Sequence, residues 1–233
     1  MSDDSATVGL ELRSLLKSSG ELELSLVEIA YPAPGPDEVL VRVEGSPINP
    51  SDLGRLFGPA NLSTATLQGS ANRPVLTAQV AQAGLRSAIS RVDQSLTVGN
   101  EGAGVVVKAG SSSLAQSLLG RIVATVSGGM YTQYRMLKSA DCLVLPEGTA
   151  AMDGASSFIN PLTALGMVET MRREGHTALV HTAAASNLGQ MLNRICVNDG
   201  IDLVNIVRSA EQQDLLRGLG AKYVCNSELP NFV

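Results

Sequence analysis

Polar and apolar residues alternate in short segments throughout the first part of the chain. In residues 21–29 leucine alternates with glutamate and serine, so one face is apolar and the other polar, as in a half-buried strand. Residues 39–45 alternate in the same way after a turn rich in proline. Further segments of this kind, separated by glycine and proline turns, are VVVKAG, RIVATVSGG, MYTQYRML and CLVLPEG. Short strands with such turns are typical of a β-barrel or a β-sandwich.

From Ala150 onward the apolar spacing becomes helical. Residues 160–175 have Pro161 in the first turn and glycine at the end, which predicts a helix. A second helix, closed by Gly200, has one apolar face, formed by Leu188, Met191, Leu192, Ile195 and Cys196. In a third, EQQDLLRGLGA, we expect three leucines to face inward: Leu215, Leu216 and Leu219. The buried strands TALVH, DLVNIV and KYVCN alternate with these helices, which predicts a parallel, doubly wound sheet.

This change of pattern predicts two domains, residues 1–156 and 157–233. Residues 58–95 are rich in Ser, Thr, Ala and Gln, and we expect them to form an insertion with local structure, including a strand at PVLTAQV. A complete doubly wound domain has about six strands, and only three are recognisable here. We therefore expect the second domain to be the first part of a longer one, with its third strand left as an open edge.

Composition excludes several classes of function. The net charge of -5 and the lack of a basic block argue against a nucleic-acid binder. No apolar run approaches the roughly 20 residues of a membrane helix, and the acidic N-terminus lacks a signal core. The three cysteines are scattered, which argues against a disulfide framework or a zinc cluster and fits a reducing cytoplasm. We expect Cys196 to be a buried apolar side chain.

The segment LVHTAAASNLGQML runs from a strand into a helix through small residues. A Rossmann fold places its pyrophosphate-binding glycines at such a turn. If Gly189 is the third glycine of the G-x-G-x-x-G pattern, Ala184 and Ser186 occupy the first two positions. The alternative is an ordinary turn in which Ser186 or Asn187 caps the helix.

The next strand ends at Arg208, where an NAD-preferring fold carries an acidic residue. A guanidinium group at this position suits the 2′-phosphate of NADP. Asp202 lies at the other end of the strand and does not replace the acidic residue. The alternative for Arg208 is an exposed arginine without a ligand.

Five motifs carry a resemblance to a known family: NPSD, NEGAGVV, NPLTALGM, HTAAASNLGQ and NIVRS. Their order and spacing over residues 21–233 resemble the medium-chain dehydrogenase/reductase superfamily, and more narrowly its zinc-free quinone oxidoreductase and enoyl-thioester reductase branch. The resemblance implies an α/β protein with a GroES-like β-barrel domain, a partial Rossmann domain and an active site between them. It places the NADPH contacts at Thr182, Ala184, Ser186, Asn187, Leu188, Gly189 and Arg208.

Zinc-dependent members of this family carry their metal ligands at positions that here hold Asn49, Asn100 with Glu101, and Asn160. Neutral amides are poor zinc ligands beside thiolate and imidazole, so we expect no metal. Asn49, Asn100 and Thr163 are our candidates for orienting the cofactor or contacting the substrate oxygen. The alternatives are turn-forming asparagines and a threonine that caps its helix. We expect Asp52 and Glu101 to position backbone turns.

The resemblance implies hydride transfer from NADPH to a small molecule, a quinone or an α,β-unsaturated carbonyl. Enoyl-thioester reductases carry a tyrosine proton donor after the NPSD-like motif; here that stretch has none, and Tyr131 and Tyr134 match no family position. Thioester reduction is therefore one alternative, and a non-catalytic NADPH-binding or interaction protein is another. Because the family often dimerises through its Rossmann edge, the resemblance also implies a homodimer as one arrangement.

Overall fold

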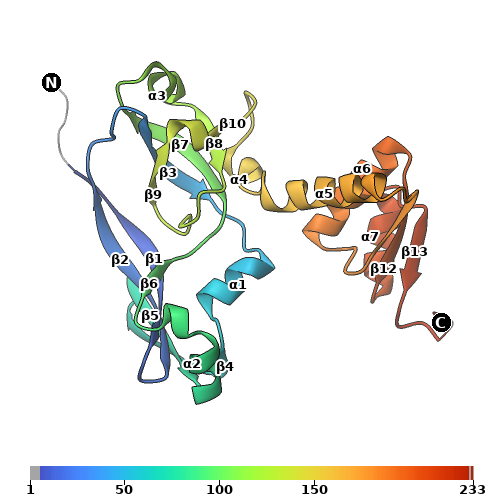
Figure 1. The fold of residues 1–233 in the computed structure, drawn as a ribbon, viewed down its shortest axis with the longest axis horizontal. Helices are drawn as coiled ribbons and strands as arrows, with labels where there is room; N and C mark the ends of the chain where they lie inside the picture. Colours follow the sequence, from blue (N-terminus) through green and yellow to red (C-terminus); the bar gives the residue numbers. More distant parts are fainter. Residues whose placement is uncertain (1–5, 231, 233) are drawn as a thin grey trace. The chain divides into compact units, whose positions relative to one another are not determined.

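A computed structural model describes residues 6–230 and 232 and divides the chain into two compact units, Met1–Ser157 and Phe158–Val233. In Figure 1 the first unit runs from blue to yellow and the second from orange to red. The first unit contains antiparallel sheets and the second a parallel sheet, so the predicted fold class is confirmed.

The strands of the first unit are β1 (Thr7–Lys17), β2 (Glu21–Tyr31), β3 (Glu38–Gly45), β4 (Ala60–Ser70), β5 (Arg73–Val80), β6 (Ser95–Thr97), β7 (Gly102–Ala109), β8 (Ile122–Thr125), β9 (Tyr134–Lys138) and β10 (Leu143–Val144). Its helices are α1 (Pro50–Leu56), α2 (Gln82–Ser87), α3 (Ser113–Leu118) and α4 (Ala151–Gly154), with 3₁₀ turns η1 (Ile89–Arg91) and η2 (Ser139–Asp141). Within the described residues the strands form sheets ordered β4-β5-β2-β1-β6 and β10-β8-β7-β3-β9. An isolated bridge joins Glu11 of β1 to Thr132, which lies just before β9.

β1 is a strand that the sequence analysis did not predict. It pairs with β2 along its whole length, from Thr7 opposite Tyr31 to Lys17 opposite Glu21. Two of its buried positions are polar, Glu11 and Ser14. They interrupt the apolar alternation by which strands are recognised.

The predicted insertion forms β4, β5, α2 and η1. β5 pairs with β2 and extends the first sheet, and β4 is its outer strand. The expected strand at PVLTAQV is confirmed as β5. Leu85 is buried against Leu16, Leu22 and Val80, so the segment packs on the first sheet through an apolar cluster that it shares with β1 and β2.

The second unit consists of α5 (Ile159–Arg173), β11 (Ala178–His181), α6 (Asn187–Asp199), β12 (Asp202–Val207), α7 (Ala210–Gly218) and β13 (Tyr223–Asn226). The strands are parallel in the order β11-β12-β13. β13 is an edge of this sheet, as expected, but β11 is an edge as well. α6 ends at Gly200, whose φ of 66° is the left-handed conformation that favours glycine. The buried position of Cys196 is confirmed.

Two burial predictions for the second unit are wrong. β11 is not fully buried: Val180 is 68% exposed, whereas Leu179, on the opposite face, packs with the α5–α6 core. Successive strand residues point to opposite faces, and the helical core covers only the Leu179 face. Leu215 is 44% exposed. Leu216 and Leu219 pack in the core on this side of the sheet, and Leu215, about 100° around the helix from Leu216, lies outside that cluster.

Candidate functional site

The turn between β11 and α6 has the geometry of an anion-binding helix start. Ser186 is the N-cap of α6, and its Oγ accepts a hydrogen bond from the backbone N–H of Gly189 at 3.1 Å. Because the hydroxyl accepts this bond, its own proton remains available for donation. Ser186 therefore caps α6, and capping leaves it able to contact a phosphate.

Gly189 permits close packing of α6 against this turn. A Cβ atom at this position would lie 2.2 Å from the carbonyl oxygen of Ala184, a distance that real side chains do not tolerate. Ala184 itself is fully buried. This agrees with the role of the third glycine in the dinucleotide motif, which allows the helix to approach the strand.

Ala183 is a feature of the turn that the sequence analysis missed. Its φ of 53° places a non-glycine residue in the left-handed region, which costs about 1–2 kcal/mol. Such strain gathers at functional sites, where the surrounding structure imposes it. The sequence pattern placed the demand for a permissive backbone at Ala184 and Ser186, one and three residues after Ala183.

A pocket of about 800 Å³ opens beside this turn. It lies at the carboxyl ends of the strands, where open α/β sheets bind ligands. Among the predicted residues, Thr182, Ser186 and Arg208 line it. Gln212 and Ser227 also line it and were not predicted. Ser227 directly follows β13, so its place at the same end of the parallel sheet was the available signal.

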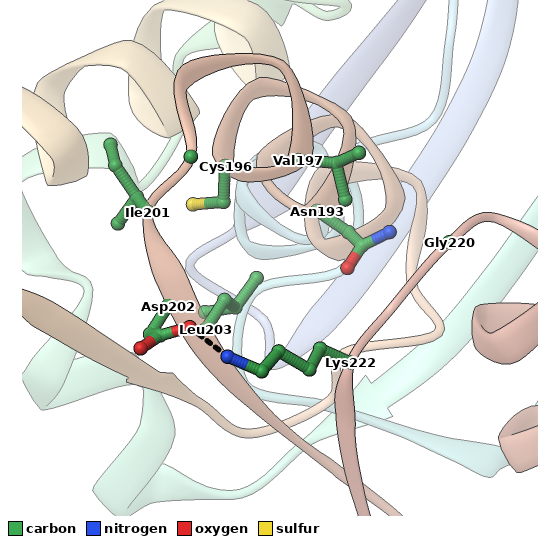
Figure 2. A pocket seen from close by; sticks show the side chains of 9 residues that line it. Asn193, Cys196, Val197, Ile201, Asp202, Leu203, Gly220 and Lys222 are labelled. Atoms are coloured by element: carbon green, nitrogen blue, oxygen red, sulfur yellow. Dashed lines mark hydrogen bonds and ion pairs between the residues drawn. The ribbon is translucent and has the colours of Figure 1, made fainter.

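A smaller pocket of about 300 Å³ lies at the opposite ends of the strands, shown in Figure 2. There Asp202, the first residue of β12, pairs with Lys222 at 3.2 Å between Oδ1 and Nζ. Asp202 therefore lies away from Arg208 and from the turn between β11 and α6, as the sequence analysis expected.

His181 is the last residue of β11 and immediately precedes the turn to α6. Its Nε2 is buried and has no hydrogen-bond partner among the described residues, and burial lowers its pKa from the ordinary value of 6.5. The imidazole is therefore neutral near pH 7.

Acidification is expected to destabilise the second unit through His181. Between the lowered pKa and about 6.5 the unfolded chain binds more protons than the folded chain, so stability falls as the pH drops through this window and is constant above it. Thermal unfolding followed by circular dichroism between pH 8 and pH 5 measures the effect. His181→Gln should lose this part of the pH dependence. His176→Gln, at the exposed second histidine of the chain, should retain it; equal profiles for the two variants would contradict the assignment.

In the first unit, Asp52 joins the NPSD and NEGAG motifs. This buried carboxylate accepts backbone N–H bonds from Asn49 at 2.8 Å and from Asn100 at 2.9 Å. The expectation that Asp52 positions backbone turns is confirmed. The structure thus brings Asn49 and Asn100 together at the start of α1.

The side chains of the two asparagines differ in accessibility. Asn49 is buried, and its Nδ2 donates to Oε1 of the fully buried Glu101 at 3.0 Å. Asn100 is partly exposed, and its Nδ2 donates to Oγ of the exposed Ser51 at 3.0 Å. Ser51 was not among the predicted residues, although it lies within the NPSD motif. Asn100 and Ser51 are therefore accessible polar side chains at this junction of α1 with the NEGAG motif.

Tyr131 borders the same junction. Its hydroxyl donates to the carbonyl oxygen of Pro47 at 3.0 Å. Burial, with a contribution from the nearby Asp52 carboxylate, raises the pKa of Tyr131 well above its usual range. The phenol therefore stays protonated at every physiological pH.

Thr163 and Asn160 belong to the second unit. The Thr163 hydroxyl donates to the carbonyl oxygen of Ile159 at 2.6 Å, a bond within its own helix, and the side chain is exposed. Asn160 is buried.

Across residues 6–230 and 232, no group of three or more His, Cys, Asp or Glu side chains could hold a metal ion. No helix in this part of the chain is long and apolar enough to span a membrane.

The chain is similar in sequence to enoyl reductases and to a quinone-oxidoreductase homolog. The chain is 31% identical over 216 residues to a mitochondrial enoyl-[acyl-carrier-protein] reductase of Xenopus tropicalis, covering 89% of this chain and 52% of that protein. It is 26% identical to a chloroplastic quinone-oxidoreductase homolog of Spinacia oleracea, covering 89% and 57%. The chain thus spans about half the length of these relatives. No family model matches it.

Solved structures show the same fold. A putative NADPH:quinone reductase from Mesorhizobium loti has a TM-score of 0.67 and 29% identity, covering all of this chain and 63% of that one. A putative NADPH:quinone reductase from Bacillus thuringiensis has a TM-score of 0.70 at 21% identity, covering 97% and 60%. The fold of this chain therefore also occurs in these solved structures.

Proposed function

The chain belongs to the medium-chain dehydrogenase/reductase superfamily, and we propose that it serves the zinc-independent, NADPH-dependent reduction of a quinone or an α,β-unsaturated carbonyl. The observation that carries this proposal is the pocket between the capped start of α6 and Arg208. When bound, NADPH supplies the hydride.

The lining of this pocket fits a phosphorylated dinucleotide. The N-terminus of α6 and the Ser186 hydroxyl offer donors to a pyrophosphate. Arg208, at the end of β12, offers a guanidinium to a 2′-phosphate. Of the other predicted contacts, Thr182 lines the pocket, and Ala184 and Gly189 shape the turn from within.

The first unit supplies donors of the kind that reduction of a carbonyl-activated bond requires. The Ser51 hydroxyl accepts from Asn100 and keeps its proton, and Asn100 has a second Nδ2 hydrogen. Donors of this kind stabilise negative charge that develops on a substrate oxygen. We assign substrate contact to Asn100, assisted by Ser51, whereas Asn49 holds Glu101 and orients the junction. Thr163 remains a candidate for orienting the cofactor.

Enoyl-thioester reduction is the second candidate function. The similarity to mitochondrial enoyl-[acyl-carrier-protein] reductases favours it, whereas the absence of a tyrosine after the NPSD motif disfavours it. A non-catalytic NADPH-binding protein is the third. The cytoplasmic location and the homodimer also remain predictions.

NADPH oxidation at 340 nm against quinones, enones and enoyl thioesters tests these functions, with NADPH binding measured in parallel. Turnover with quinones or enones, and less with thioesters, supports the proposal. Turnover with thioesters alone favours the second candidate. Binding without turnover favours the third, and the lack of NADPH binding contradicts all of them.

A further inference from the structure

Helix α1 carries the polar junction of the first unit and is only seven residues long. The last carbonyl groups of a helix have no partner within it and need donors from elsewhere. A short helix gains little stability from its own hydrogen bonds. The position of α1 therefore depends on what holds its two ends.

At the N-terminal end, Asp52 attaches α1 to the NEGAG motif, as described above. At the other end, Arg91 donates through Nη1 to the carbonyl oxygen of Gly54 at 3.0 Å and through Nη2 to that of Arg55 at 2.9 Å. The same Nη2 lies 2.8 Å from Oγ of Ser14. A guanidinium group has its donors in a fixed plane and can hold several acceptors at once.

The surroundings of Arg91 support this arrangement. Ser14 is fully buried in β1 and donates to the carbonyl oxygen of Leu56, the last residue of α1. Gly58 has a φ of 54°, and a Cβ at this position would lie 3.0 Å from Nη1 of Arg91. Glycine at this position therefore leaves room for the guanidinium group beside the helix.

We propose that Arg91 is a positioning residue through which the segment 58–95 fixes α1, and with it Ser51 and Asn100, at the junction. Arg91 is the last residue of η1 and so belongs to the segment that the sequence marks as an insertion. The segment thereby acquires a role: it holds the C-terminal end of the helix whose N-terminal end presents the polar donors. The consequence for substrate reduction rests on the proposed function.

Hydrogen exchange in Arg91→Ala tests the attachment itself. Charged hydrogen bonds are lost at α1, so the amides of Phe57 and Gly58, which bond to Leu53 and Gly54, should exchange about tenfold faster or more. Amides of β3 and β7 should be unchanged. Arg86→Ala, at an exposed arginine of the same segment, is the matched control and should behave as wild type. Unchanged exchange at α1, or an equal rise in β3 and β7, would overturn the proposal.

Kinetic measurements distinguish a positioning role of Arg91 from a general loss of stability. In Arg91→Ala, kcat should fall while the Kd for NADPH is unchanged, because the cofactor pocket belongs to the second unit. Millimolar guanidinium ion should restore part of kcat in this variant and have no such effect on wild type. An unchanged kcat would refute positioning. If wild type fails to bind NADPH, the proposed function fails, while the exchange experiment still decides whether Arg91 holds α1.

Discussion

Gly189→Ala is expected to abolish measurable NADPH binding while the first unit remains folded. The added Cβ would lie 2.2 Å from the backbone oxygen of Ala184 and 2.7 Å from its Cα. Backbone atoms cannot move aside as a flexible side chain can, so α6 has to shift away from the turn. The shift carries the Ser186 cap and the N-terminal amides of α6 with it, and these are the groups that would face the pyrophosphate.

Isothermal titration of wild type and Gly189→Ala with NADPH measures this effect. Gly166→Ala is the matched control, because a Cβ at Gly166 in α5 meets no atom within 4 Å and alanine favours the helix. The control should bind NADPH as wild type does. If Gly189→Ala also binds with wild-type affinity, α6 does not form the phosphate site.

Glu11→Gln is expected to destabilise the first unit by about 3 kcal/mol. Glu11 is only 2% exposed. Its carboxylate pairs with Nε of Arg13 and, at 3.4 Å, with Nη1 of Arg135. Removal of one partner from a buried ion pair leaves the other charges without compensation, which costs more than the pair itself contributes.

Urea unfolding followed by tyrosine fluorescence measures this loss. Three of the four tyrosines, Tyr31, Tyr131 and Tyr134, lie in the first unit. Glu28→Gln is the control, since Glu28 and Arg73 form an ion pair of 2.7 Å on the surface, and exposed pairs contribute little. An equal loss of unfolding free energy in both variants would show that the burial of Glu11 does not raise the cost of removing its charge.

Much of the fold follows from the sequence because the local patterns agree with the tertiary structure. The bounds of β12 match DLVNIV, and α6 ends at the predicted glycine. In these elements apolar spacing, capping residues and turns all favour the same structure. The order of the five motifs indicated the family resemblance, which no single motif could indicate alone.

The remaining features depend on contacts that spacing does not encode. β1 was missed because Glu11 and Ser14 are buried through partners far along the chain, Arg135 and Leu56. The candidate site was found in part. Arg208 and Ser186 follow from the order of strand and helix, whereas the strain at Ala183 arises from the turn as a whole. The link between Ser51 and Asn100 joins two motifs about fifty residues apart and becomes visible only in the fold.

We propose that the second unit binds NADPH and that Arg208 recognises the 2′-phosphate of this cofactor. The most direct test is the pair of dissociation constants for NADPH and NADH, measured in wild type and in Arg208→Ala. A charged hydrogen bond contributes about 1.5–3 kcal/mol, so its loss should weaken NADPH binding by roughly tenfold or more and leave the affinity for NADH nearly unchanged. Arg194→Ala, at an exposed arginine of α6 outside the pocket, should change neither constant. An unaltered NADPH/NADH ratio in Arg208→Ala would contradict the account.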